Sequence, residues 1–166
     1  MTKTRGFEPV EIAHQKYGKE VAVHGQKQTF YPNIILPTRG DAGSAGYDIY
    51  APVDFKIDPR NEYLLWTNVK AYMGNGEVLQ IFPRSSVAVK RGVTIKNTVG
   101  IIDSSYYSND MNDGNIGLCL MNNTGTTVEF KAGERIAQGI FIPFLIADDD
   151  ELMASTRNGG FGSTGK

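Results

Sequence analysis

Short apolar and β-branched runs, separated by Gly, Pro, Asn and Asp, recur along most of the chain. Runs of this length favour β-strands, because turn residues interrupt the chain before a helix of ordinary length can form. The pattern predicts an all-β fold, either a barrel or a sandwich. The expected strands are Asn33–Leu36, Tyr47–Ala51, Glu62–Val69, Val78–Phe82, Val93–Ile95, Ile116–Met121, Thr126–Phe130 and Ile136–Ile142.

Helical periodicity is scarce. One short helix is predicted from Ser85 to Lys90, where a serine can cap the first turn and Gly92 can end the last. Residues 9–32 are polar and show little periodicity, so we expect a partly ordered insertion or a hairpin there.

Composition favours a single domain and excludes several classes of function. The 166 residues, 40% of them hydrophobic, suffice for one core, and we expect one domain over residues 1–166. The net charge of −1 argues against broad nucleic-acid binding, which needs excess Lys and Arg. Cys119 is the only cysteine and His14 and His24 the only histidines, which leaves no disulfide within the chain and too few ligands for a Cys/His zinc site.

The first residues lack the apolar run of a signal peptide, and no stretch approaches the roughly 18 apolar residues of a membrane-spanning helix. A single cysteine suits a reducing compartment. We therefore expect a soluble, cytoplasmic protein.

The last part of the chain changes composition sharply. A block of negative charge, Asp148–Glu151, precedes a Gly-rich segment, and we expect residues 147–166 to form an acidic connector and a mobile arm, with residues 1–33 an N-terminal strand and insertion. Closely spaced glycines expose backbone N–H groups that can bind an anion. Arg157 can pair with a phosphate and Phe161 offers an aromatic face to a base. The arm therefore suggests a nucleotide ligand, although a Gly/Ser tail can also lack a function.

Two further clusters could carry chemistry. Asp103 follows two apolar residues and precedes tyrosines, so it can be a partly desolvated carboxylate that takes a proton from water. The alternative is a turn residue whose carboxylate caps local N–H groups. Pro83–Ser86 places an Arg and two hydroxyls before a helix, which suits an anion, although an ordinary capped helix would look the same. Asp48 could belong simply to the polar face of a strand.

Taken in order, these clusters resemble the five motifs of the trimeric dUTPase family, and the bacterial and phage branch is the most similar. The resemblance covers residues 36–166. The segments that carry it are Ala45–Ala51, Pro83–Ala88, Gly100–Tyr106, Gly133–Gln138 and Arg157–Gly165.

The resemblance implies a distorted jelly-roll-like β-barrel and a homotrimer with three active sites shared between subunits. It implies hydrolysis of dUTP to dUMP and pyrophosphate by in-line attack of water on the α-phosphorus. That reaction keeps uracil out of DNA and supplies dUMP for thymidylate synthesis. It implies no direct contact with nucleic acid or membrane.

The resemblance also assigns roles to single residues. Asp103 would activate the water, and Tyr106 would lie under the deoxyribose and reject a 2′-hydroxyl. Asp48 would reach Mg²⁺ through water, with the ion held mainly by the triphosphate. The uracil hairpin would include Asn97, Gly100, Ile101 and Ile102. The substrate-binding residues would also include Arg84, Ser85, Ser86 and Gln138, with Ser85 and Gln138 contacting the phosphates and Arg84 ordering the site. The closing arm would contribute Arg157, Phe161, Gly162 and Ser163.

Three features depart from the family pattern. Ser105 replaces the usual second acid, and residues 108–113 are inserted before Gly114. The arm is one residue shorter between Arg157 and Phe161, so the arginine must approach the phosphate by a different path. Residues 1–33 are not explained by the resemblance.

Two alternatives remain beside the dUTP pyrophosphatase. A dCTP deaminase shares the fold, but it needs a polar base that handles the cytosine amine, and the uracil-hairpin segment has no separate glutamate for that role. A nucleotide-responsive regulatory protein is the other alternative, in which residues 9–32 and 108–113 would bind a regulatory protein partner if the chain comes from a phage.

Overall fold

The computed structural model describes residues 3–150, and they form the all-β fold that the sequence predicts. Three short helical segments interrupt the strands: η1 (Ile12–His14), η2 (Ser86–Lys90) and η3 (Ser104–Tyr106). No helix in the described range is long and apolar enough to span a membrane. The strands are β1 (Gly6–Pro9), β2 (Lys19–Val23), β3 (Gln26–Phe30), β4 (Thr38–Arg39), β5 (Tyr47–Tyr50), β6 (Phe55–Ile57), β7 (Glu62–Trp66), β8 (Val69–Tyr72), β9 (Glu77–Pro83), β10 (Val93–Ile95), β11 (Gly100–Asp103), β12 (Gly117–Asn122), β13 (Val128–Phe130) and β14 (Arg135–Pro143).

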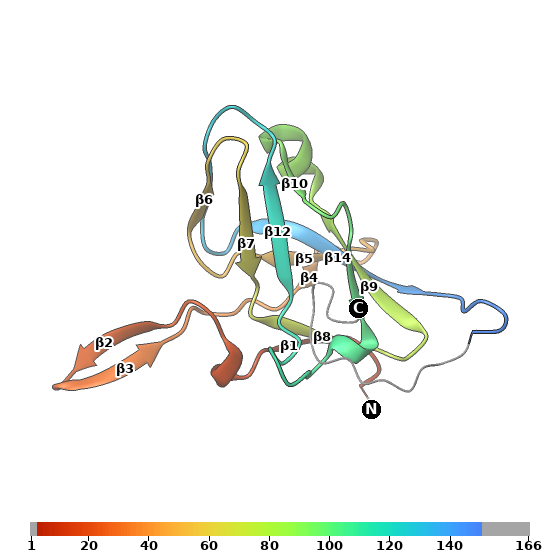
Figure 1. The fold of residues 1–166 in the computed structure, drawn as a ribbon, viewed down its shortest axis with the longest axis horizontal. Coiled ribbons are helices and arrows are strands. Elements are labelled where there is room, and N and C mark those ends of the chain that lie inside the picture. The colour runs from red at the N-terminus through yellow and green to blue at the C-terminus, as the bar shows by residue number, and fades with distance from the viewer. Residues whose placement is uncertain (1–2, 151–166) are drawn as a thin grey trace.

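Two antiparallel sheets make up most of the body (Figure 1). The larger has the order β11-β9-β14-β5-β4, and the smaller has the order β10-β12-β7. Strand pairs β1-β8 and β13-β6 complete the body, whereas the β2-β3 hairpin projects away from it. Because β14 pairs with both β5 and β9, which are distant from it in sequence, this sheet brings separate motifs of the chain onto adjacent strands.

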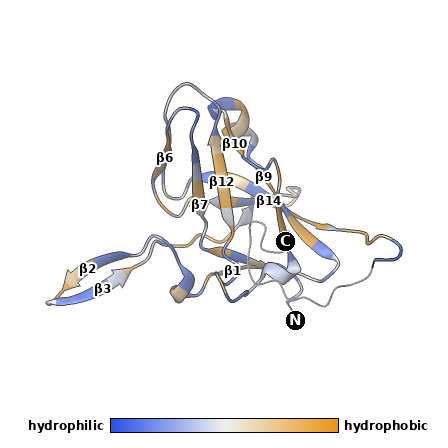
Figure 2. Cartoon of the chain, viewed as in Figure 1, coloured by the Kyte–Doolittle hydropathy of each residue, from blue (hydrophilic) through white to orange (hydrophobic). Residues whose placement is uncertain are grey.

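Alternating side chains of these strands build the core. In β12, Leu118 and Leu120 are buried while the residues between them are partly exposed, which is the period of two expected of a strand with one face inward. Figure 2 shows hydrophobic residues on β9, β10 and β12 within the body. Phe55 stacks between Tyr63 and Phe130, with ring centroids 4.8 and 4.7 Å away. Burial of each such side chain contributes about 1.5–3 kcal/mol to stability.

Two of the expected strands were wrong. Asn33–Leu36 lies in irregular backbone, because prolines flank it at positions 32 and 37 and restrict the chain. Glu62–Val69 is two strands, β7 and β8, rather than one. The break falls at Asn68, which has a φ of +58° and is fully buried, and whose side chain bonds the backbone N–H and C=O of Lys16.

The predicted short helix is present as η2, but its start differs from the expectation. Ser85 makes no side-chain capping bond; instead the carbonyl of Arg84 accepts from the N–H groups of Val87 and Ala88, both at 2.9 Å. Gly92 ends the segment as predicted, with a φ of +64° that favours glycine.

Candidate functional site

Strands β5, β14 and β9 place three sequence-predicted site residues side by side. Gln138 on β14 is opposite Asp48 on β5 and opposite Phe82 on β9, and Arg84 follows the end of β9. Gln138 also packs against Gly46, where a Cβ atom would lie 2.7 Å from its Oε1 atom. Glycine at position 46 therefore lets the glutamine side chain approach the backbone.

Asp48 is the centre of this group and is only 7% exposed. Its Oδ1 atom lies 2.9 Å from Arg84 Nε and its Oδ2 atom lies 3.2 Å from Arg135 Nη1. A buried carboxylate is stable only when it is paired, so the two guanidinium groups explain its position. Asp48 is thus more than the polar face of a strand, because it fixes two cations in one place.

A cleft of about 450 Å³ lies beside the two arginines that pair with Asp48. Arg84, Arg91 and Arg135 line it together with Ser86 and Glu134, so cationic groups outnumber acidic ones. Arg91 is held by Glu134 at 2.7 Å, and its guanidinium lies 3.9 Å from the centre of the Phe130 ring. Converging arginines and a hydroxyl suit a phosphate-bearing ligand.

Arg91 and Arg135 were not assigned a role from the sequence. Arg135 lies within the fourth motif, three residues before Gln138, and that proximity is the signal that could have identified it. Arg91 follows the helical segment and has no comparable signal, because only the fold brings it to Glu134.

A second group of predicted residues lies on β11 and η3. Gly100, Ile101 and Ile102 pair with β9, and β11 is the edge strand of its sheet. An edge strand keeps one row of backbone N–H and C=O groups outside the ladder, where they can contact a ligand. Ile101 is 50% exposed on this strand, and Asn97 lies exposed in the turn between β10 and β11. Asp103 ends the strand half-buried, as the sequence suggested.

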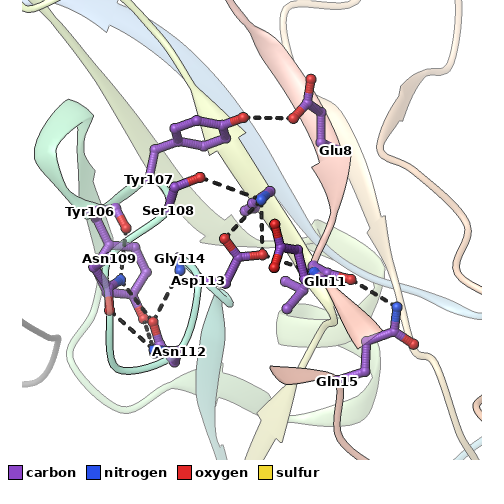
Figure 3. Close-up of polar contacts among 12 residues, drawn as sticks. Glu8, Glu11, Gln15, Tyr106, Tyr107, Ser108, Asn109, Asn112, Asp113 and Gly114 are labelled. Atoms are coloured by element: carbon purple, nitrogen blue, oxygen red, sulfur yellow. Dashed lines mark hydrogen bonds and ion pairs between the residues drawn. The ribbon is translucent and has the colours of Figure 1, made fainter. Parts of the chain in front are cut away.

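Tyr106 is only 5% exposed and is held at both ends. Its hydroxyl donates to the carbonyl of Asn115 at 2.7 Å and accepts from Asn112 Nδ2 at 2.7 Å. Its own carbonyl accepts from Asn109 Nδ2 at 2.8 Å, as Figure 3 shows. The ring is therefore held in a fixed position, three residues after Asp103 in the sequence.

The two groups do not meet within one chain. Asp103 is opposite Val78 near the start of β9, whereas Arg84 follows the end of that strand. Six residues of extended chain separate these positions, which is about 20 Å at roughly 3.4 Å per residue. Within one chain, the cationic cleft therefore lies at one end of β9. The segment Asp103–Tyr106, called the Asp103 loop below, lies at the other end.

Arg157, Phe161, Gly162 and Ser163 lie outside the described residues. Within residues 3–150, no group of three or more His, Cys, Asp or Glu side chains is arranged to hold a metal ion.

Comparisons with known proteins agree on one family. The family model for dUTPase matches residues 32–165. A deoxyuridine 5′-triphosphate nucleotidohydrolase of Lactococcus lactis is 45% identical over 140 residues, which cover 82% of this chain and 93% of that protein. The dUTPase of Streptococcus mutans has a similar solved structure, with a TM-score of 0.71, 39% identity, and coverage of 86% of this chain and 98% of that one.

A more distant structure shares the fold. The dUTPase of Staphylococcus bacteriophage 80alpha, solved with dUPNHPP, has a TM-score of 0.66 at 21% identity and covers 99% of this chain and 100% of that one. Phage dUTPases of this kind are described as controlling the transfer of virulence genes. At this identity the likeness extends to the fold alone.

Proposed function

The chain belongs to the dUTPase family and is a dUTP diphosphatase that hydrolyses dUTP, and we propose that it does so with the residues that the two groups above contain. The observation that carries the assignment of residues is the Asp48 carboxylate between Arg84 and Arg135, beside a cleft lined by arginines. A triphosphate is the part of dUTP that such a cleft suits.

In this proposal Asp103 is the general base. Its half-buried carboxylate takes a proton from water, and the water attacks the α-phosphorus in line, releasing dUMP and pyrophosphate. The fixed Tyr106 ring lies under the deoxyribose and leaves no room for a 2′-hydroxyl. The edge of β11 at Gly100–Ile102, with the turn at Asn97, reads uracil through backbone groups.

In this proposal the residues around Asp48 and Arg84 bind the phosphates. Arg84 is oriented by Asp48, and its neighbours Ser85 and Ser86 supply hydroxyls near the phosphate chain. Gln138 contributes an amide from the adjacent strand. We propose that Arg157, Phe161, Gly162 and Ser163 close over the bound nucleotide, with Phe161 on uracil and Arg157 at the γ-phosphate, which would exclude bulk water.

Mg²⁺ fits this site in an indirect role. Asp48 accepts one arginine on each carboxylate oxygen, and each oxygen keeps a further lone pair for a water molecule. We propose that the triphosphate holds most of the ion's coordination sphere and that Asp48 contacts its water shell. When bound, the ion would neutralise charge on the phosphates.

We propose a homotrimer with shared sites, and the separation along β9 supports it. Because about 20 Å of strand lies between Asp103 and Arg84, at roughly 3.4 Å per residue, a second copy of the chain must supply one of the two groups to complete a site. Closed cyclic symmetry then gives three equivalent sites from three chains. We place the reaction in the cytoplasm, where its product dUMP serves thymidylate synthesis.

The alternatives have less support. The named relatives are dUTP nucleotidohydrolases, which disfavours a dCTP deaminase. Binding of a regulatory protein at residues 9–32 or 108–113 stays a prediction, since the similarity to phage dUTPases extends to the fold alone.

The test is the product profile with each deoxynucleoside triphosphate in Mg²⁺, together with the molecular mass in solution. We expect pyrophosphate and dUMP from dUTP, little turnover of the other nucleotides, and a mass of three times 18.2 kDa. Ammonia from dCTP without pyrophosphate from dUTP would refute the assignment.

A further inference from the structure

The inserted segment 108–113 folds back on the residues that precede it. The side-chain oxygen of Asn109 accepts from the N–H groups of Met111 and Asn112, both at 3.1 Å, and its amide nitrogen donates to the Tyr106 carbonyl. Asn112 reaches the Tyr106 hydroxyl and also accepts from Gly114 N–H at 3.1 Å. The segment therefore forms hydrogen bonds to Tyr106 at its backbone carbonyl and at its ring hydroxyl (Figure 3).

A buried ion pair fastens this segment to the body. Asp113 accepts from Lys70 Nζ at 2.8 Å on both carboxylate oxygens, and each side chain is 8% exposed. Asp113 also accepts from the backbone N–H of Glu11 at 2.8 Å. Lys70 lies on β8, so the pair joins the insertion to a core strand and to the N-terminal segment at once.

Tyr107 covers the same lysine. Lys70 Nζ lies 5.1 Å from the centre of the Tyr107 ring, and the Tyr107 hydroxyl donates to Glu8 at 2.6 Å. Glu8 is directly opposite Lys70 in the β1–β8 pairing. Two consecutive tyrosines are therefore held by different parts of the chain. Tyr106 is bonded to the insertion, and Tyr107 contacts Glu8 on β1 and Lys70 on β8.

The backbone of the insertion has an uncommon conformation that these contacts stabilise. Ser108 and Asp113 have φ angles of +51° and +57°, a region that residues with side chains rarely adopt. Gly114 has a φ of +78°, and a Cβ atom there would lie 2.9 Å from the Tyr106 carbonyl oxygen. Such a conformation persists when the surrounding contacts determine it.

We propose that Lys70 and Asp113 are positioning residues for the reaction: their buried pair holds the insertion, and through it Tyr106 and the adjoining Asp103 loop, in the geometry that accepts dUTP and rejects UTP. The inference rests on the proposed roles of Tyr106 and Asp103. A ring that excludes a 2′-hydroxyl must be fixed to a fraction of an ångström, because a looser ring leaves space for it.

The test is the double variant Lys70→Met/Asp113→Asn, which removes both charges and leaves neither buried alone. Asparagine tolerates the φ of +57° at position 113 and can still accept from the Glu11 N–H, so the backbone of the insertion is not strained by the change itself. Asn122→Ala is the matched control, because Asn122 is fully buried and bonds the carbonyls of Ile57, Asp58 and Thr126, away from the insertion. Steady-state kinetics with dUTP and UTP would be combined with hydrogen exchange of the ligand-free proteins over residues 104–115.

We expect the double variant to lose roughly 10- to 100-fold in kcat for dUTP and about tenfold in selectivity for dUTP over UTP. Exchange over residues 104–115 should accelerate. Asn122→Ala should keep the wild-type selectivity and the wild-type exchange over that range, even where its melting temperature falls.

Wild-type selectivity together with wild-type exchange in a folded double variant would overturn the inference. If the double variant does not fold, the single variant Asp113→Asn decides in its place, since it weakens the pair with Lys70, keeps an acceptor for the Glu11 N–H, and should lower selectivity in the same way. A wild-type protein that releases no pyrophosphate from dUTP would instead refute the proposed function, and the exchange data would still report whether the pair orders the loop.

Discussion

Two aspartates of the candidate site have different surroundings, and the difference separates their roles. Asp48 is almost fully buried between two arginines, so its charge is used to orient cations. Asp103 ends the edge strand β11 and is half-buried, so water can reach it. A general base needs contact with the reacting water, which favours Asp103 for that role.

Asp103→Asn should therefore abolish most turnover while leaving dUTP binding largely intact. The amide keeps the shape of the side chain but cannot take the proton, and loss of a general base lowers kcat by roughly 10²- to 10⁴-fold. Steady-state kinetics and calorimetric titration with dUTP would measure the two effects. Near-normal turnover would rule out the general-base role.

Asp113 should make the stability of the protein depend on pH in the acid range. Burial raises the pKa of this carboxyl. The hydrogen bond from the Glu11 N–H and the Lys70 ammonium together lower the pKa by more than burial raises it, so the pKa is below the ordinary value of 3.8. Because the folded pKa is lowered, the stabilisation is present above the unfolded pKa and is lost as the pH falls through the folded pKa.

We expect the free energy of unfolding of the wild type to fall below pH 4 with a steeper slope than that of Asp113→Asn, by up to about 1.4 kcal/mol per pH unit for one proton. Urea titrations followed by the fluorescence of Trp66, the only tryptophan, would give both curves. Parallel curves would show that Asp113 titrates alike in the folded and unfolded states.

At the scale of elements, β9 organises the site because it pairs with β11 on one side and β14 on the other. Its strand was predicted from the sequence, as were β10 and β14, since each is a short apolar run bounded by turn residues. A hairpin was one of the two expectations for residues 9–32, and β2 and β3 form one there. Their positions were not predicted, because their residues are polar and mostly exposed and bury no face that would leave a period of two.

The predicted site residues were placed in two groups that local patterns could not combine. The resemblance named Arg84, Asp48 and Gln138 from three separate segments, and the sheet order brings them together. The Lys70–Asp113 pair could not be foreseen, because it joins residues 43 positions apart and neither residue lies in a recognised pattern. Long-range pairing of this kind depends on tertiary structure.

The β2-β3 hairpin should contribute little to the stability of the body. Its residues are nearly all exposed, and the Lys27–Glu20 ion pair across it is also exposed, which makes it worth little. Replacing residues 21–28 by Asn-Gly keeps the opposed residues Glu20 and Thr29 for a tight turn. We expect the free energy of unfolding to change by less than about 1 kcal/mol.

Thermal unfolding and the elution volume of this variant would check the prediction. A large fall in melting temperature, or a change in mass, would mean that the hairpin packs against another chain. The control is the full-length protein at the same concentration, because the stability of an oligomer depends on concentration.

At the scale of the whole molecule, the proposed site residues of one chain form two separate groups. The cationic cleft and the Asp103 loop lie at opposite ends of β9. In the proposed homotrimer, rotation about a three-fold axis would let each copy present its cleft to the Asp103 loop of the next copy.

Mixing two inactive variants tests this arrangement directly. Arg84→Ala removes a proposed substrate-binding side chain and Asp103→Asn removes the proposed base, so each variant alone should be nearly inactive. After the two are unfolded together and refolded as a mixture, random assembly should pair an intact Asp103 loop with an intact Arg84 in some sites and restore roughly a quarter of wild-type activity. Each variant refolded alone is the control. If the mixture stays as inactive as its components, while the masses show that mixed trimers formed, both groups must come from the same chain.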